Sequence, residues 1–391
     1  MTPIPRRIAF VTPRYGEHIL GGAESLIQNT AVRIAQRGHH VEIFSTSAKS
    51  PRTWESERDV IHAEINGIPA HLFPIRYTDR AHFRDLHQRL HAGDALTPDE
   101  QLDWIHCGPH SASLYAALHE QRNNFDLFVC APYSFPLIHY AAAAVLPRAA
   151  IWPCLHDELY ADLLPTRLLL RDCFCIFYNT EEENNLAQSR IGIRHPHARV
   201  VGSGVDDIPG DAQRFRSTHG IRDPFLLYAG RIEAGKNVPL LLEFFAQYKA
   251  TRHSDLKLVL IGEGRSGAAS ADVIQLGYLS EQDKRDAMAA ATALCQPSVH
   301  ESLSYVVLES WLAGVPVLVH SRCAVTRMHV VHSGGGLHFE DAEVFGAAVD
   351  ALLTNPALHS RMGADGRTYA RTRYGWPDVL DRFEQCMNDW L

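Results

Sequence analysis

Two cationic residues on one short turn have the chemistry needed to bind a diphosphate. Arg231 and Lys236 lie in the run GRIEAGKN, residues 230–237, between a strand-like segment and a helical one. Arginine offers a planar fork of donors and lysine a compact charge, and phosphate sites use both. Open parallel sheets bind ligands at the carboxyl ends of their strands, which favours binding over two merely solvated cations. We therefore predict that Arg231 and Lys236 contact a diphosphate.

A second group of polar residues lies in the run ESLSYVVLE, residues 301–309. We expect a helix to begin near Ser304. The main-chain N–H groups of Leu303, Ser304 and Tyr305, together with the helix dipole, would then favour a pyrophosphate. Glu301 lies in the loop before this helix, within reach of sugar hydroxyls.

Glu309 is a carboxylate among apolar residues, well inside the same expected helix. A carboxylate in such surroundings needs a polar partner. A ribose diol would supply two hydroxyl donors, whereas the apolar neighbours leave little room for a solvated helical face. We predict that Glu309 binds a ribose.

The first half of the chain carries weaker signals. Gly21 and Gly22 directly precede a helical pattern, where glycines let N–H groups approach an anion, although a simple tight turn would use them equally well. Their spacing is not the G-x-G-x-x-G of dinucleotide-binding proteins, which disfavours a dehydrogenase. His156 follows a strand-like run at the expected ligand-binding edge, so we interpret it as a pocket residue.

Composition and missing motifs disfavour other classes of function. The net charge of -8 argues against a nucleic-acid-binding protein that relies on global positive charge. The sequence contains no D-x-D, H-E-x-x-H or C-x-x-C motif, so we expect no metal site. Scattered cysteines indicate reduced thiols and a cytoplasmic protein. No stretch is long and apolar enough to span a bilayer, and peripheral contact with the inner membrane face stays open.

Short strands alternate with helical patterns in two successive series, which predicts parallel sheets covered by helices on both faces. Residues 76–110, rich in histidine and arginine, break the rhythm, and we expect a helical insertion there. The stretch 202–211, rich in Gly, Pro and Asp, is interpreted as a linker. The expected strands are residues 8–11, 41–44, 70–73, 125–130, 149–154, 175–179, 199–201, 225–229, 256–261, 273–276, 293–296 and 317–319.

These elements predict an α/β chain with two Rossmann-like, doubly wound parallel-sheet domains and a cleft between them. The first domain would hold residues 1–203 and the second residues 204–373. Each has the size of an ordinary domain.

In order and spacing, the motifs resemble the retaining glycosyltransferase family 4, the group 1 transferases, which have the GT-B fold. The resemblance covers nearly the whole chain. One element departs from the family: Gly-Phe-Gly usually follows its first glutamate, whereas Ser302, Leu303 and Ser304 stand here and restrict the approach of the main chain to phosphates. The matching elements are GGAE at 21–24, GR and KN within 230–237, GYLS at 277–280, E-x7-E at 301–309 and AGVPV at 313–317.

The resemblance implies a role for each matched residue. Arg231 and Lys236 would stabilise the leaving diphosphate, Glu301 would hold hydroxyls of the donor sugar, and His156 would line the sugar pocket. It also implies that residues 374–391 cross back onto the first domain. Further contacts with the donor would come from Gly21, Gly22, Gly230, Asn237, Tyr278, Leu279, Leu303, Ser304, Tyr305 and Glu309.

The activity implied by the resemblance is retaining, metal-independent transfer of a hexose of the mannose, glucose or N-acetylglucosamine type. The donor would be a nucleotide diphosphate-sugar, no cofactor would be needed, and the acceptor would be a glycan, lipid or small molecule. Residues 76–110 and the loop near His18 would face the acceptor. Two alternatives stay open, a GT-B-fold epimerase of nucleotide-sugars and a nucleotide-sugar-binding protein without turnover.

Overall fold

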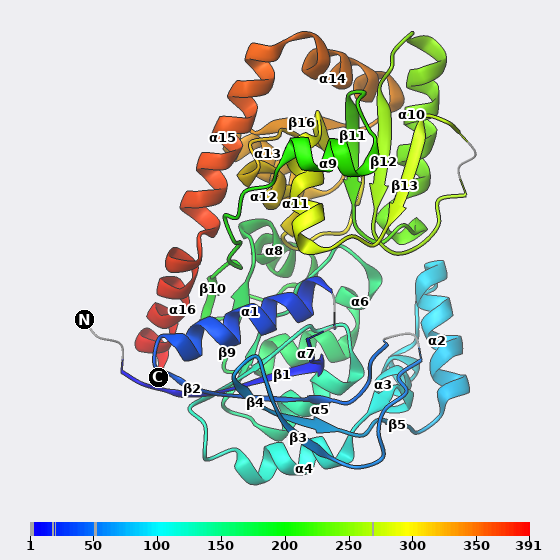
Figure 1. Ribbon diagram of the computed structural model, residues 1–391. Coiled ribbons are helices and arrows are strands. Elements are labelled where there is room, and N and C mark those ends of the chain that lie inside the picture. Colours follow the sequence, from blue (N-terminus) through cyan, green and yellow to red (C-terminus); the bar gives the residue numbers. More distant parts are fainter. Residues whose placement is uncertain (1–3, 18, 20, 51–52, 268–269) are drawn as a thin grey trace. The chain divides into compact units, whose positions relative to one another are not determined.

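The computed structural model describes residues 4–17, 19, 21–50, 53–267 and 270–391, which form two compact units (Figure 1). The first unit consists of Met1–Gly204 and Val379–Leu391, and the second of Val205–Asp378. The chain therefore leaves the first unit after Gly204 and returns to it after Asp378. Each unit is an α/β structure built on a parallel sheet, as predicted.

The described part of the first unit contains an eight-stranded sheet with the order β10-β9-β8-β7-β1-β2-β4-β3. Its strands run parallel, apart from the antiparallel pair β3 and β4. The strands are β1 (Arg7–Arg14), β2 (His40–Thr46), β3 (Ile61–Ile65), β4 (Ile68–Phe73), β7 (Leu127–Cys130), β8 (Ala149–Ile151), β9 (Cys175–Tyr178) and β10 (Ala198–Val200). The helices are α1 (Gly22–Gln36), α2 (Arg80–Ala92), α3 (Pro98–Cys107), α4 (Ala112–Gln121), α5 (Pro136–Ala144), α6 (Leu159–Asp162), α7 (Leu164–Asp172), α8 (Glu181–Leu186) with its π-helical continuation η1 (Ala187–Ile191), and α16 (Trp376–Trp390).

Alternate side chains of each strand enter two apolar layers, because successive residues of a strand point to opposite faces. On β1, Ala9 and Val11 belong to a core shared with Leu137 of α5. Phe10 faces the other way and stacks against Phe383 of α16, with ring centroids 6.4 Å apart. Helices therefore cover both faces of the sheet.

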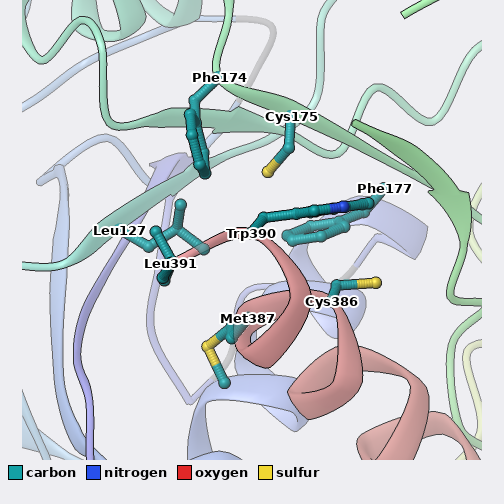
Figure 2. A pocket seen from close by; sticks show the side chains of 8 residues that line it. All are labelled: Leu127, Phe174, Cys175, Phe177, Cys386, Met387, Trp390 and Leu391. Atoms are coloured by element: carbon teal, nitrogen blue, oxygen red, sulfur yellow. The ribbon is translucent and has the colours of Figure 1, made fainter. Parts of the chain in front are cut away.

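Helix α16 packs its apolar side against β7 and β9 of the first unit (Figure 2). The ring of Trp390 stacks on Phe177 at 6.2 Å with an interplanar angle of 12°. Cys386 and Met387 of the same helix lie beside Leu127 in a small apolar crevice. The crevice is a packing seam of the first unit.

The predicted helical insertion at residues 76–110 is confirmed. A short antiparallel pair, β5 (Arg76–Tyr77) and β6 (Pro109–His110), encloses α2 and α3. Local signals define both helices: the Asp79 side chain caps α2, and Thr97 and Glu100 form a capping box at the start of α3.

Among the described residues of the second unit, six parallel strands form a sheet with the order β13-β12-β11-β14-β15-β16. Leu227 of β11 packs into the core that contains Trp311 of α12, and its neighbour Leu226 into the core that contains Phe245 of α10. The strands are β11 (Phe225–Ala229), β12 (Lys257–Ile261), β13 (Val273–Gly277), β14 (Ala293–Gln296), β15 (Val317–His320) and β16 (Gly336–Phe339). The helices are α9 (Ala212–His219), η2 (Ala234–Lys236), α10 (Val238–Thr251), α11 (Glu281–Ala290), α12 (Tyr305–Leu312), α13 (Ala324–Ser333), α14 (Ala342–Thr354) and α15 (Pro356–Tyr374).

No helix in the described ranges combines the length and the apolar character that crossing a membrane requires. All eight cysteines fall within these ranges and are free thiols. Burial raises the pKa of Cys173 to about 12 and that of Cys386 to about 11, so both thiols stay protonated at neutral pH and act as small apolar side chains.

Candidate active site

The loops that follow β11 and β12 are in direct contact through their main chains. Gly230 N donates to Ile261 O at 3.0 Å, and Ile232 N donates to Glu263 O at 2.6 Å. A Cβ atom on Gly262 would lie 2.0 Å from the oxygen of Gly230, and Gly262 has a φ of 130°. Only glycine fits this contact. Gly262 was not among the predicted site residues, although a Gly-x-Gly directly after a buried strand signals close main-chain approach.

Asn237 links two loops at the carboxyl ends of the strands. It ends the short helix η2 with a left-handed φ of 59°, a conformation that asparagine tolerates. Its Nδ2 donates to the main-chain oxygen of Pro297, in the loop after β14, at 3.0 Å. This bond holds the β11 loop, with its two cations, against the β14 loop, which leads to Glu301.

Lys236 and Glu301 form the central ion pair of the second unit. Lys236 Nζ lies 2.8 Å from Glu301 Oε1, and the side chains are 25% and 12% exposed. The motif that contains Lys236 and the motif that contains Glu301 are therefore in contact, although the two residues are 65 positions apart in the chain. A cation and a carboxylate are therefore placed side by side.

Arg231 lies in the same loop but is more open to solvent. Its guanidinium pairs with Glu233 at 3.0 Å, and its side chain is 61% exposed. The Arg231 main-chain oxygen accepts a hydrogen bond from the hydroxyl of Tyr228, which fixes the loop below the side chain. Burial and the nearby Glu301 and Glu233 carboxylates raise the pKa of Tyr228 far above its usual range, so this hydroxyl stays a donor.

Helix α12 begins directly after Ser304, as predicted, but its first turn is unusual. Ser304 has a left-handed φ of 67°, and its hydroxyl accepts from the Gln296 side chain at 3.2 Å. Leu303 is 3% exposed and belongs to the core, so its side chain is not available to a ligand. Serine therefore adopts a main-chain conformation that glycine would adopt at lower cost.

Glu309 has a protein partner that the sequence did not reveal. Its Oε1 lies 3.0 Å from Nζ of Lys284, a residue of α11. Its Oε2 is buried and has no hydrogen-bond partner among the described residues. Nearby, β13 ends at Gly277, after which Tyr278 is 55% exposed and Leu279 packs partly against the core.

The remaining predicted site residues, His156, Gly21 and Gly22, belong to the first unit. His156 follows β8, and its Nδ1 lies 3.5 Å from Glu158 Oε1. Helix α1 begins at Gly22. The carboxylate of Glu24, in the first turn, points back to the N-terminus of the helix, so that a Cβ on Gly21 would lie 2.2 Å from Glu24 Oε2. The chain's own carboxylate thus lies where we predicted an anionic ligand. The roles of these three residues stay predictions, and His18 lies outside the described residues.

The chain is similar to known proteins over both units. Residues 211–369 match the family described as Glycosyl transferases group 1, a range that contains Arg231, Lys236, Glu301 and Glu309. D-inositol 3-phosphate glycosyltransferase 1 of Catenulispora acidiphila is 25% identical over 390 residues, which cover 93% of this chain and 89% of that protein. Lipopolysaccharide glucosyltransferase WaaG of Escherichia coli is 24% identical over 373 residues, which cover 92% and 93%.

The crystal structure of HepE from Anabaena in complex with UDP has a TM-score of 0.71 at 17% identity and covers 98% of this chain and 100% of that one. HepE has also been solved with UDP-glucose. Two α/β units, each built on a sheet of mainly parallel strands, and this likeness define the GT-B fold. The second unit matches the group 1 glycosyltransferase family over residues 211–369, and the two relatives that align over both units are named glycosyltransferases. This result favours transfer over the epimerase and the binding protein without turnover.

Proposed function

We propose that the protein is a retaining, metal-independent hexosyltransferase that uses a nucleotide diphosphate-sugar as donor. The proposal rests on the Lys236–Glu301 pair, whose charged atoms lie 2.8 Å apart. In a nucleotide-sugar, phosphate oxygens adjoin sugar hydroxyls. A cation beside a hydroxyl acceptor is complementary to that junction.

The chemistry follows from where charge develops. The bond between the anomeric carbon and the phosphate oxygen breaks through an oxocarbenium-like state, and negative charge builds on the leaving diphosphate. Lys236, Arg231 and the N–H groups at the start of α12 would meet that charge without reorganising. The acceptor oxygen would attack from the same face, its proton would pass to the leaving phosphate, and the anomeric configuration would be retained.

UDP-glucose is the first donor to test. HepE has been solved with UDP and UDP-glucose, and WaaG is named a glucosyltransferase. The names of the relatives given above contain an inositol phosphate and a lipopolysaccharide. The panel of acceptors to test should therefore include small polyols and glycolipids. Metal independence is supported by the absence of a D-x-D motif and by two cations in the β11 loop.

The proposal is tested first by binding. Thermal unfolding of the full chain is measured with UDP-, GDP- and ADP-hexoses, and a donor at about 100 times its Kd should stabilise the protein by about 2.7 kcal/mol. The same donor should give Lys236→Ala a clearly smaller shift. If no nucleotide-sugar stabilises the wild-type protein, the donor assignment is wrong.

Turnover is tested with the donor that binds. NMR of the product should show the anomeric configuration of the donor, and the rate should be unchanged by EDTA. An inverted product would refute retention. A rate that EDTA abolishes and a divalent cation restores would refute metal independence.

A further inference from the structure

Lys284 lies between two carboxylates at one end of α11. Its Nζ is 3.0 Å from Glu309 Oε1 and 2.9 Å from Glu281 Oε2, and its side chain is 20% exposed. Burial lowers the pKa of Lys284, but the carboxylates of Glu309 and Glu281 outweigh it, and the net pKa is raised. Lys284 is therefore a charged group at neutral pH.

Lysine is rare in this chain, so the pairing of two lysines with the two glutamates of one motif is notable. Apart from Lys49, the lysines are Lys236, Lys249, Lys257 and Lys284. Lys236 pairs with the first glutamate of the E-x7-E element and Lys284 with the second. Each glutamate thus has its own fixed cation.

The pairing leaves Glu309 half satisfied. Lys284 holds Oε1, whereas Oε2 is buried and accepts no hydrogen bond from any described residue. A buried acceptor without a donor is costly, and it suits a ligand that brings hydroxyl donors. The ion pair also fixes the orientation of the carboxylate, because one oxygen is tied to α11 and the other must point elsewhere.

We propose that Lys284 is a positioning residue that gives the donor site its selectivity for ribose over deoxyribose. By holding Oε1, it keeps the Glu309 carboxylate oriented, so that Oε2 accepts hydrogen bonds from the 2′ and 3′ hydroxyls. This inference rests on the proposed nucleotide-sugar donor and adds a residue that determines its specificity. Lys284 acts through Glu309 and contacts no reacting atom.

Removing the lysine charge should weaken the ribose contact while sparing the phosphate contacts. In Lys284→Met the Glu309 carboxylate loses the cation that fixes Oε1, and it turns toward solvent. This change removes an oriented acceptor for the diol. Lys236 and Arg231, which bind the phosphates in this proposal, are unchanged.

The experiment compares pairs of nucleotides by calorimetry on the full chain. The probes are whichever of UDP, GDP and ADP binds, and its 2′-deoxy analogue. The wild-type protein should bind the ribonucleotide about tenfold more tightly, a difference of about 1.4 kcal/mol. In Lys284→Met the two Kd values should agree within about twofold, and Lys284→Arg should retain part of the preference because it keeps the charge.

Lys257→Met is the matched control. Lys257 Nζ pairs with Asp272 at 2.6 Å and its side chain is 22% exposed, but it lies at the start of β12, at the end of the strand opposite the candidate site. This variant should keep the wild-type preference. A variant that merely destabilised the second unit would weaken both nucleotides equally and leave their ratio unchanged.

Two kinds of result overturn the inference. If Lys284→Met keeps the wild-type ratio, or binds the ribonucleotide more tightly, Lys284 does not position Glu309 for the diol. The same holds if the wild-type protein does not distinguish the two nucleotides, although the proposed donor class would then survive. If the wild-type protein binds no nucleoside diphosphate, the proposed function fails together with the inference.

Discussion

Replacing Lys236 by alanine should reduce turnover far more than stability. The residue meets Glu301 at 2.8 Å, and we assign it to the charge that builds on the leaving diphosphate. Removing one preorganised donor from such a site costs about 10²–10³ in kcat. Because the Lys236 side chain is 25% exposed, water screens part of its field, so we expect the lower end, about 100-fold or about 2.7 kcal/mol.

The effect on folding should be small by comparison. An ion pair that is partly open to solvent contributes about 1 kcal/mol or less to the free energy of unfolding. In a unit of this size that corresponds to a Tm decrease of at most about 4 °C. Rate and stability therefore separate the catalytic role from a structural one.

The assay measures steady-state kcat with saturating donor and acceptor, alongside thermal unfolding. Lys257→Ala serves as the control, since Lys257 forms a comparable ion pair with Asp272 at the other end of β12. It should keep wild-type kcat. Turnover of Lys236→Ala within threefold of wild type, or an equal loss of activity in Lys257→Ala, would refute the catalytic role of Lys236.

Three further predictions concern other residues of the second unit. Arg231→Ala should lower kcat by about tenfold, less than Lys236→Ala, because the Arg231 side chain is 61% exposed and its field is more strongly screened; steady-state kinetics measures the ratio. Asp286 is buried, which would raise its pKa, but hydrogen bonds from Arg214 and other donors lower the net pKa. Its ionised form therefore stabilises the fold above the unfolded pKa of about 3.9, and this contribution is lost as pH falls through the folded pKa. Asp286→Asn should cost about 2 kcal/mol at pH 7 in urea unfolding, and the difference should vanish in acid; a difference that persists would contradict the ionic role. Gly262→Ala should cost about 3 kcal/mol in the same assay, since its Cβ would lie 2.0 Å from a main-chain oxygen, whereas an equal loss in Gly235→Ala would remove that explanation.

The alternation of strands and helices was predictable because buried strands in a parallel sheet are continuous apolar runs. The predicted strand at residues 225–229 coincides with β11, and the one at 293–296 with β14. Besides the short pair β5 and β6, one strand of each large sheet was missed. β3 alternates apolar and polar residues before Asn66 and Gly67, whose φ values of 55° and 75° form a hairpin turn; Asn-Gly was the available signal. β16 has no comparable signal, because it begins with Gly336 and the exposed His338 interrupts its apolar run.

The candidate site was predictable at the level of motifs. From the ends of the expected strands, the glycines and the charged residues, we predicted that Lys236, Glu301 and Glu309 lie on loops and a helix near the carboxyl edge of one sheet. Which lysine meets which glutamate was not predictable, because these contacts depend on how separate loops fold over one another. Lys284 shows the limit most clearly: it is an ordinary charged residue of an exposed-looking helix until α11 and α12 are placed side by side.

The return of the chain to its first unit has a consequence for synthesis. Phe383 is fully buried among Phe10, Trp152 and Phe177, and all three are translated long before it. A nascent chain that has reached Gly204 still lacks α16, and with it the ring of Phe383 that covers these three aromatic side chains. The first unit therefore stays incomplete, with these apolar side chains exposed, until the second unit and α16 have been synthesised. The protein's first domain to begin folding is therefore the last to finish.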